Sequence, residues 1–167
     1  MKIQLTYQHM INTLSRIILL VTIIIANIAT AKAMTVDDIL KQQHAPPGVV
    51  FEIVSGQPKL LDKLLPHLKT DIKRLRKRFP DLSIAIVSHG LEQFALTTKN
   101  RQDSKTAHNL VQQLVNEREI KVHICETFAS WQGISAEDFP DYVNVSPAGP
   151  AQINDYLELD YELITLP

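Results

Sequence analysis

The sequence has one cysteine, Cys125, among 167 residues, so it cannot form an intramolecular disulfide. A chain of this length can bury a sufficient apolar core without disulfide support. It also lacks the Gly-x-Gly-x-x-Gly and P-loop patterns, which leaves phosphate-loop nucleotide binding with little support. No Gly-x-Ser-x-Gly elbow is present, so a Ser-His-Asp hydrolase is only weakly supported.

Acidic residues are absent before Asp37, and this segment has the organisation of an export signal. Basic residues Lys2 and Arg16 precede an apolar run over residues 17–29, and a small-x-small triplet ends at Ala33. The apolar run is short for a membrane span, which needs ~20 residues. We therefore predict a signal peptide over residues 1–33, cleaved after Ala33, and a periplasmic or secreted protein. An uncleaved signal that anchors the chain in the membrane is the alternative.

The remaining chain is predicted to hold an N-terminal arm over residues 34–48 and one α/β domain over residues 49–167. Removal of Lys2, Arg16 and Lys32 with the signal leaves 14 basic and 18 acidic residues. A mildly acidic domain is a poor general binder of nucleic acid, so no nucleic-acid partner is expected.

Runs rich in β-branched residues alternate with amphipathic segments along the domain. The predicted strands cover residues 49–54, 82–87, 120–125, 142–145 and 161–166. Between them, apolar residues at helical spacing predict helices over residues 61–79, 91–96, 107–115 and 151–159. Pro66 is expected to kink or restart the first of these helices. The alternation predicts a three-layer α/β fold, with a mostly parallel sheet of about five strands and helices on both faces.

Reactive groups in parallel α/β sheets gather at the carboxyl ends of the strands. The third predicted strand ends at Cys125, which is therefore the candidate nucleophile. A thiol at this edge could meet helix N-termini, whose dipoles favour thiolate, although the adjacent Glu126 disfavours a second negative charge. The other strand ends supply possible contacts for a ligand or thiolate; these are Ser55, His89, Gly90, which permits a sharp exit from the strand, and Thr127.

His123 lies two residues before Cys125, so both side chains are expected on the same face of the sheet. Two ligands are too few for a metal site, and the other histidines are scattered. We therefore predict no metal site and no cofactor, and we interpret His123 as a strand histidine satisfied by its neighbours.

Four features in order resemble one known family. They are the strand that ends in Val87-Ser88-His89-Gly90, the strand that ends at Cys125, the segment Thr127…Gly133…Glu137-Asp138, and Val143-Asn144-Val145-Ser146-Pro147-Ala148-Gly149-Pro150 leading to Tyr161-Glu162-Leu163-Ile164. The chain from Val49 to Leu166 thereby resembles the DsrE/DsrF-like sulfur-relay family, as an exported member. The resemblance implies a three-layer α/β fold and homo-oligomers, often trimers or hexamers. It also implies that Cys125 accepts a sulfane sulfur as a persulfide and passes it to a partner.

Two functional hypotheses follow. The first is an exported protein that carries or transfers sulfane sulfur on Cys125, with a thiol or sulfur-donor protein as partner. The second is an oligomeric module that binds a small ligand or a protein, in which Cys125 is structural and non-reactive.

Overall fold

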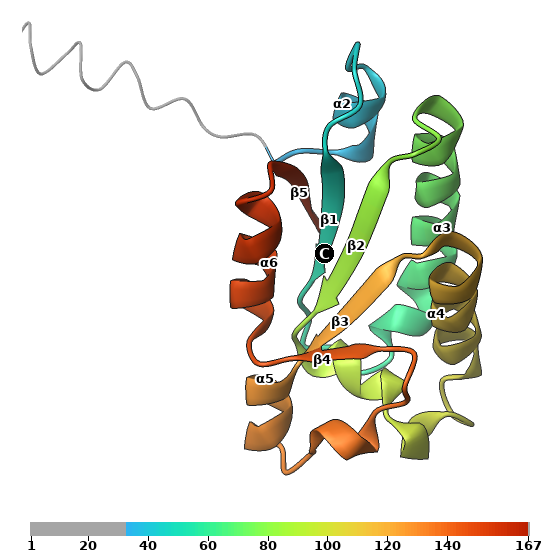
Figure 1. Cartoon of the computed structure of the whole chain (residues 1–167). Coiled ribbons are helices and arrows are strands. Elements are labelled where there is room, and N and C mark those ends of the chain that lie inside the picture. Colours follow the sequence, from blue (N-terminus) through green and yellow to red (C-terminus); the bar gives the residue numbers. More distant parts are fainter. Residues whose placement is uncertain (1–32, 167) are drawn as a thin grey trace, which may run out of the picture. The chain divides into compact units, whose positions relative to one another are not determined.

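A computed structural model describes residues 33–166, which form one five-stranded sheet whose strands all pair in parallel (Figure 1). The strands are β1 (Gly48–Ile53), β2 (Ser83–Ser88), β3 (Lys121–Cys125), β4 (Asn144–Ser146) and β5 (Tyr161–Leu166). Their order in the sheet is β4-β3-β2-β1-β5. The predicted α/β class and parallel sheet are confirmed. The predicted signal peptide, residues 1–33, lies outside the described residues except for Ala33.

Helices cover both faces of the sheet. They are α2 (Val36–Leu40), α3 (Leu60–Arg78), α4 (Lys105–Arg118), α5 (Glu126–Trp131) and α6 (Gly149–Leu157), with 3₁₀ turns η1 (Leu91–Leu96), η2 (Thr98–Asn100) and η3 (Ala136–Asp138). Helices α3 and α4 pack on one face and α6 packs on the other (Figure 1). Within residues 33–166, no helix combines the length and apolarity that a membrane crossing requires.

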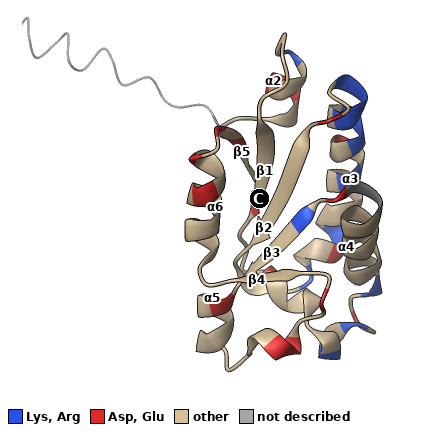
Figure 2. Cartoon of the chain, in the orientation of Figure 1, with Lys and Arg blue, Asp and Glu red and all other residues tan. Residues whose placement is uncertain are grey.

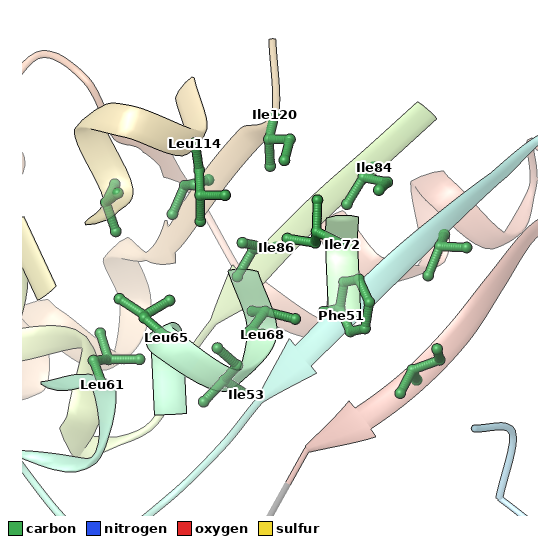
Figure 3. Packing of buried hydrophobic residues seen from close by; sticks show 14 of the residues in the cluster. Phe51, Ile53, Leu61, Leu65, Leu68, Ile72, Ile84, Ile86, Leu114 and Ile120 are labelled. Atoms are coloured by element: carbon green, nitrogen blue, oxygen red, sulfur yellow. The ribbon is translucent and has the colours of Figure 1, made fainter. Parts of the chain in front are cut away.

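The larger core lies between the sheet and the α3–α4 layer (Figure 3). Leu61, Leu65, Leu68 and Ile72 recur at helical spacing and place one face of α3 on the sheet. Successive side chains of a strand point to opposite faces of the sheet. In β1, the side chain of Phe51 belongs to the larger core and faces the α3–α4 layer. Strands β1 and β2 are apolar at most positions on both faces because helices cover both.

Within residues 33–166, α6 is the helix that covers the second face. Its apolar cluster consists of Val50, Ala85, Val87, Ile153 and Tyr156, with Tyr161 and Leu163 packed against it. Polar side chains complete this layer beside β3 and β4. The two layers therefore differ strongly in the apolar area that holds them.

Helix α2 belongs to the same packed body. Thr35 and Asp38 form a capping box at its start, and Ile39 is fully buried in the larger core. Arg74 of α3 pairs with Asp37 at 2.5 Å, and Arg78 donates to the carbonyl of Gln42. Part of the basic face of α3, visible in Figure 2, therefore holds the segment that precedes β1.

Two local expectations differ from the structure. Helix α3 runs unbroken through the exposed Pro66, so it does not restart there. Strand β4 begins two residues later than predicted. The N–H of Val143 bonds to the carbonyl of Pro140 in a turn, which keeps it out of the ladder.

Candidate functional site

The carboxyl edge of the sheet brings Cys125 and His89 to the ends of neighbouring strands. The ladder between β2 and β3 ends with Ser88 paired to Ile124, and His89 and Cys125 are the residues that follow on the two strands. His89 packs against Gly149 of α6, which places it on the α6 face of the sheet. Alternation along β3 places Cys125 on that same face.

Cys125 is both the last residue of β3 and the N-cap of α5. Its Sγ accepts the backbone N–H of Phe128 at 3.4 Å. A sulfur at this position therefore has a fixed backbone donor, of the kind that stabilises sulfur anions at helix N-termini. The residue is only 5% exposed, which limits the access of a reagent to its sulfur.

Gln93 holds the backbone of Cys125 with both ends of its amide. The Cys125 N–H donates to Oε1 of Gln93 at 2.8 Å, and Nε2 of Gln93 donates to the Cys125 carbonyl at 3.4 Å. Gln93 is fully buried in η1. The Gln93 amide therefore satisfies both backbone hydrogen-bonding groups of Cys125 and fixes its backbone at the carboxyl edge of the sheet.

The neighbouring Glu92 is a fully buried carboxylate that joins the ends of β1 and β2. It accepts the N–H of Ser55 at 2.7 Å, the hydroxyl of Ser88 at 2.8 Å and the N–H of Gly90 at 2.9 Å. Three donors offset the cost of removing the carboxylate from water. The backbone N–H groups of Ser55 and Gly90, two residues predicted as possible ligand contacts, are thus bonded to Glu92.

The reason for glycine at position 90 differs from the prediction. Gly90 has an ordinary extended backbone, with φ −109°, which any residue can adopt. A Cβ at this position would instead lie 2.5 Å from the backbone N and O of Ser55. Close approach of two chain segments, rather than a sharp turn, requires glycine here.

Thr127 joins α5 to the segment that leads into α6. Its N–H donates to the carbonyl of Pro147 at 3.1 Å, and its hydroxyl donates to the same carbonyl at 2.6 Å. The hydroxyl proton is therefore committed to this contact, although the residue is exposed.

His123 lies at the centre of a buried polar network between β3, β4 and α6. Its Nδ1 is 2.8 Å from Oγ of Ser146, and its Nε2 is 2.9 Å from the hydroxyl of Tyr156. Since the Ser146 hydroxyl donates to Gln152, it accepts from Nδ1, and Nε2 accepts from Tyr156. The prediction of a strand histidine satisfied by neighbours is confirmed.

Stability is expected to fall below pH 6.5 because of His123. Burial, with Lys121 adding to it, lowers the pKa of His123 from 6.5 to about 4. The unfolded chain therefore takes up this proton first, and the contribution is lost as the pH falls from 6.5 to about 4. The slope for one proton is at most ~1.4 kcal/mol per pH unit. Urea unfolding across this range should show a flatter pH dependence for His123→Gln than for the wild type, and equal slopes would contradict the assignment.

A polar cleft of about 640 Å³ lies at the opposite, amino-terminal edge of the sheet. Ser83 and Lys121 line it at the starts of β2 and β3, with Tyr156 and Tyr161 on the α6 side. The cleft is thus separated from Cys125 by the length of β3. Within residues 33–166, no group of three or more His, Cys, Asp or Glu side chains is arranged to hold a metal ion.

The fold matches solved structures, whereas the sequence matches neither a family model nor a curated protein. The structure of MTH1491 from Methanobacterium thermoautotrophicum, a protein of unknown function, matches with a TM-score of 0.57 at 16% identity. The match covers 71% of this chain and 97% of that one. The YchN protein from E. coli matches with a TM-score of 0.52 at 17% identity, over 71% of this chain and 99% of that one. These likenesses establish the shared α/β fold.

Proposed function

We propose that this protein is an exported carrier of sulfane sulfur that forms a persulfide on Cys125. One observation carries the proposal: Cys125 ends β3 and caps α5, with its Sγ in contact with a backbone N–H. The resemblance of the sequence to the DsrE/DsrF-like family supports it, and the observed fold is the one that this resemblance implies. Export rests on the basic, apolar and small-x-small pattern of residues 1–33.

The chemistry would be an exchange between a thiol and a sulfane donor. The Cys125 thiolate attacks the terminal sulfur of a donor persulfide, R–S–SH. A new S–S bond forms at Cys125, the donor S–S bond breaks, and the donor leaves as its thiolate. An acceptor thiolate then attacks the outer sulfur and releases Cys125 as a thiolate. The N–H of Phe128 would stabilise the cysteine sulfur each time it carries negative charge.

Intact-mass measurement after incubation with polysulfide tests the proposal. We expect the wild type to gain one sulfur atom, and dithiothreitol should remove it. The Cys125→Ser variant should gain none, and it differs by one atom at a buried position. The proposal would be contradicted if the wild type takes up no reducible sulfur, or if Cys125→Ser takes up as much sulfur as the wild type.

The 5% exposure of Cys125 favours a second candidate function. In this alternative, the protein is an oligomeric module that binds a small ligand or a protein, and Cys125 is a packed structural residue. Titration with a bulky thiol reagent separates the two. A thiol that reacts only after unfolding supports the binding module, and one that reacts in the folded state supports the carrier.

We also propose that the protein assembles into homo-oligomers, with a trimer or hexamer as the expected form. Large apolar side chains are exposed on its surface; they are Trp131 (73%), Leu159 (62%), Val54 (45%) and Leu157 (39%). Exposed apolar side chains are enriched where protein surfaces meet. Size-exclusion chromatography with light scattering should give a multiple of the chain mass, and a monomer at micromolar concentration would contradict this expectation.

A further inference from the structure

The charges of this chain are unevenly distributed along the sequence. Lys121 is its last basic residue, and residues 122–167 contain no lysine or arginine. The same residues hold eight acidic side chains, which are Glu126, Glu137, Asp138, Asp141, Asp155, Glu158, Asp160 and Glu162. From Glu126 onward the chain forms α5, η3, β4, α6 and β5, and Figure 2 shows the acidic residues of α5 and α6 away from the basic face of α3. This part of the surface therefore attracts cations and repels anions.

The only tryptophan of the sequence lies in this acidic part, at the end of α5. Trp131 is 73% exposed. Its ring packs edge-on against the ring of Phe128, with centroids 6.1 Å apart, and Phe128 stacks on Phe94 of η1 at 5.8 Å. These contacts support the indole and leave most of it exposed to solvent. Tryptophan is enriched among the residues that dominate the binding energy of protein interfaces, so Trp131 marks a site of contact.

Phe128 connects the aromatic group to the candidate nucleophile. Its backbone N–H donates to Sγ of Cys125, and its ring is the one that contacts Trp131. A thiol that exchanges sulfur with Cys125 must come within bonding distance of the sulfur that is transferred. The residues that flank this thiol in a partner protein would then lie against α5.

Carboxylates surround the exposed indole. Glu126 is the first residue of α5 and is exposed. After Trp131 the chain turns back on α5, where the N–H of Ile134 bonds to the carbonyl of Ala129, and it then enters η3 with Glu137 and Asp138.

The two carboxylates of η3 are ionised at neutral pH. Hydrogen bonds from backbone N–H groups at the start of η3 lower the pKa of Glu137 and of Asp138. Lys99 of η2 is the cation whose charge acts on Asp138. Together with Glu126, the carboxylates outnumber this cation, so the surroundings of Trp131 are negative.

The other exposed leucines lie elsewhere on the molecule. Leu157 and Leu159 fall between Tyr156 and Tyr161, which both line the cleft at the amino-terminal edge of the sheet. A self-assembly surface at that edge leaves Trp131 open. Two copies cannot cover it by bringing their α5 helices together without placing like charges against each other.

We propose that the α5 surface, formed by Glu126, Phe128, Trp131, Glu137 and Asp138, docks a partner protein whose reactive cysteine lies beside an apolar residue and among basic residues. This inference rests on the proposed sulfur carriage and names the chemistry of its partner. In the transfer, the partner thiolate bonds to the outer sulfur, the S–S bond at Cys125 breaks, and Cys125 leaves as a thiolate. The exchange therefore needs no oxidant or reductant.

Fluorescence of Trp131 tests docking without sulfur chemistry, because it is the only tryptophan. The probes are two synthetic peptides with a cysteine next to a leucine, flanked by lysines in one and by glutamates in the other. Full-length Cys125→Ser should bind the lysine peptide at least about 10-fold more tightly at low ionic strength, and salt should reduce the difference. A lysine peptide with serine in place of the leucine should bind more weakly. Equal affinities for the lysine and glutamate peptides, or an emission that the lysine peptide leaves unchanged, would overturn the inference.

Charge variants locate the docking surface. Replacement of both Glu126 and Glu137 by glutamine should weaken binding of the lysine peptide and reduce its salt dependence. Glu119→Gln is the control, because it makes the same change at an exposed glutamate in the amino-terminal cleft. A control that loses as much affinity as the double variant would contradict the assignment.

Sulfur transfer gives the kinetic readout. The persulfide of the wild type should pass sulfur to the lysine peptide at least about 10-fold faster than to the glutamate peptide at low ionic strength. Trp131→Ala should slow transfer to the lysine peptide, whereas Leu159→Ala, at the other edge, should not. Equal transfer rates to the two peptides would count against the inference.

The mass of the assembly identifies what covers Trp131. In size-exclusion chromatography with light scattering, Trp131→Ala should keep the mass of the wild type. A smaller mass would show that a second copy covers this side chain, and it would overturn the inference.

The docking surface and sulfur carriage fail in different ways. If the wild type takes up no persulfide, yet Cys125→Ser binds the lysine peptide selectively, sulfur carriage is removed and the docking surface is retained. If the wild type takes up a persulfide, yet both peptides bind equally and accept sulfur equally, sulfur carriage is retained and the docking surface is removed.

Discussion

Replacement of Glu92 by alanine is expected to lower the free energy of unfolding by about 3–5 kcal/mol. The carboxylate is fully buried and accepts the N–H groups of Ser55 and Gly90 and the hydroxyl of Ser88. The hydroxyl can rotate to another acceptor, but the two backbone donors cannot. Each buried donor without a partner costs ~1–3 kcal/mol, and the lost side chain adds a packing term.

Urea unfolding followed by circular dichroism measures this effect. Glu126→Ala serves as the matched control, because Glu126 is an exposed glutamate at the same edge of the sheet, and its change should stay within ~0.5 kcal/mol. Glu92→Gln should lie between the two, since the amide keeps the volume and one acceptor oxygen. A loss below ~1 kcal/mol for Glu92→Ala would show that the stability of the carboxyl edge of the sheet does not depend on this carboxylate.

Substitution of Gly90 by alanine should cost about 2–3 kcal/mol, through overpacking rather than backbone strain. The added methyl group would lie 2.5 Å from the backbone N and O of Ser55, and a main chain held by Glu92 has little freedom to retreat. Relief of the clash would separate the ends of β1 and β2.

Gly56→Ala is the control, because no atom lies within 4 Å of a Cβ at that position. It should be neutral or slightly stabilising, as alanine reduces the freedom of the unfolded chain. If the two variants unfold at the same urea concentration, the close approach at Gly90 has no energetic weight.

The sheet was predictable because its signal is local. Runs such as Ile84 to Val87 are apolar at every position, which indicates burial on both faces, and parallel pairing follows from the intervening helices. The carboxyl edge followed from the same reasoning, which located Ser55, His89, Gly90, Cys125 and Thr127 at strand ends. The start of β4 was missed because a single turn bond at Val143 decides it.

The roles of the residues at that edge were less accessible. Glu92 reaches Ser55 across 37 positions of sequence, and Gln93 reaches Cys125 across 32. The hydroxyl of Thr165 bonds to Glu52 across 113 positions. Such contacts depend on which strands become neighbours, and a single sequence carries no record of that. The sequence signal for these contacts was the polar pair Glu92 and Gln93 inside the otherwise apolar stretch Leu91 to Leu96.

The uneven layering of the sheet has a kinetic consequence for Cys125. Helix α6 is held by a small apolar cluster and by polar contacts such as Tyr156 to His123, whereas α3 and α4 rest on the larger core. Local openings with few apolar contacts have free energies well below that of global unfolding. We therefore expect α6 to detach as a separate unit, exchanging its amide hydrogens before β1 and β2. The buried thiol would then be reached at the rate of that opening, while the rest of the sheet stays folded.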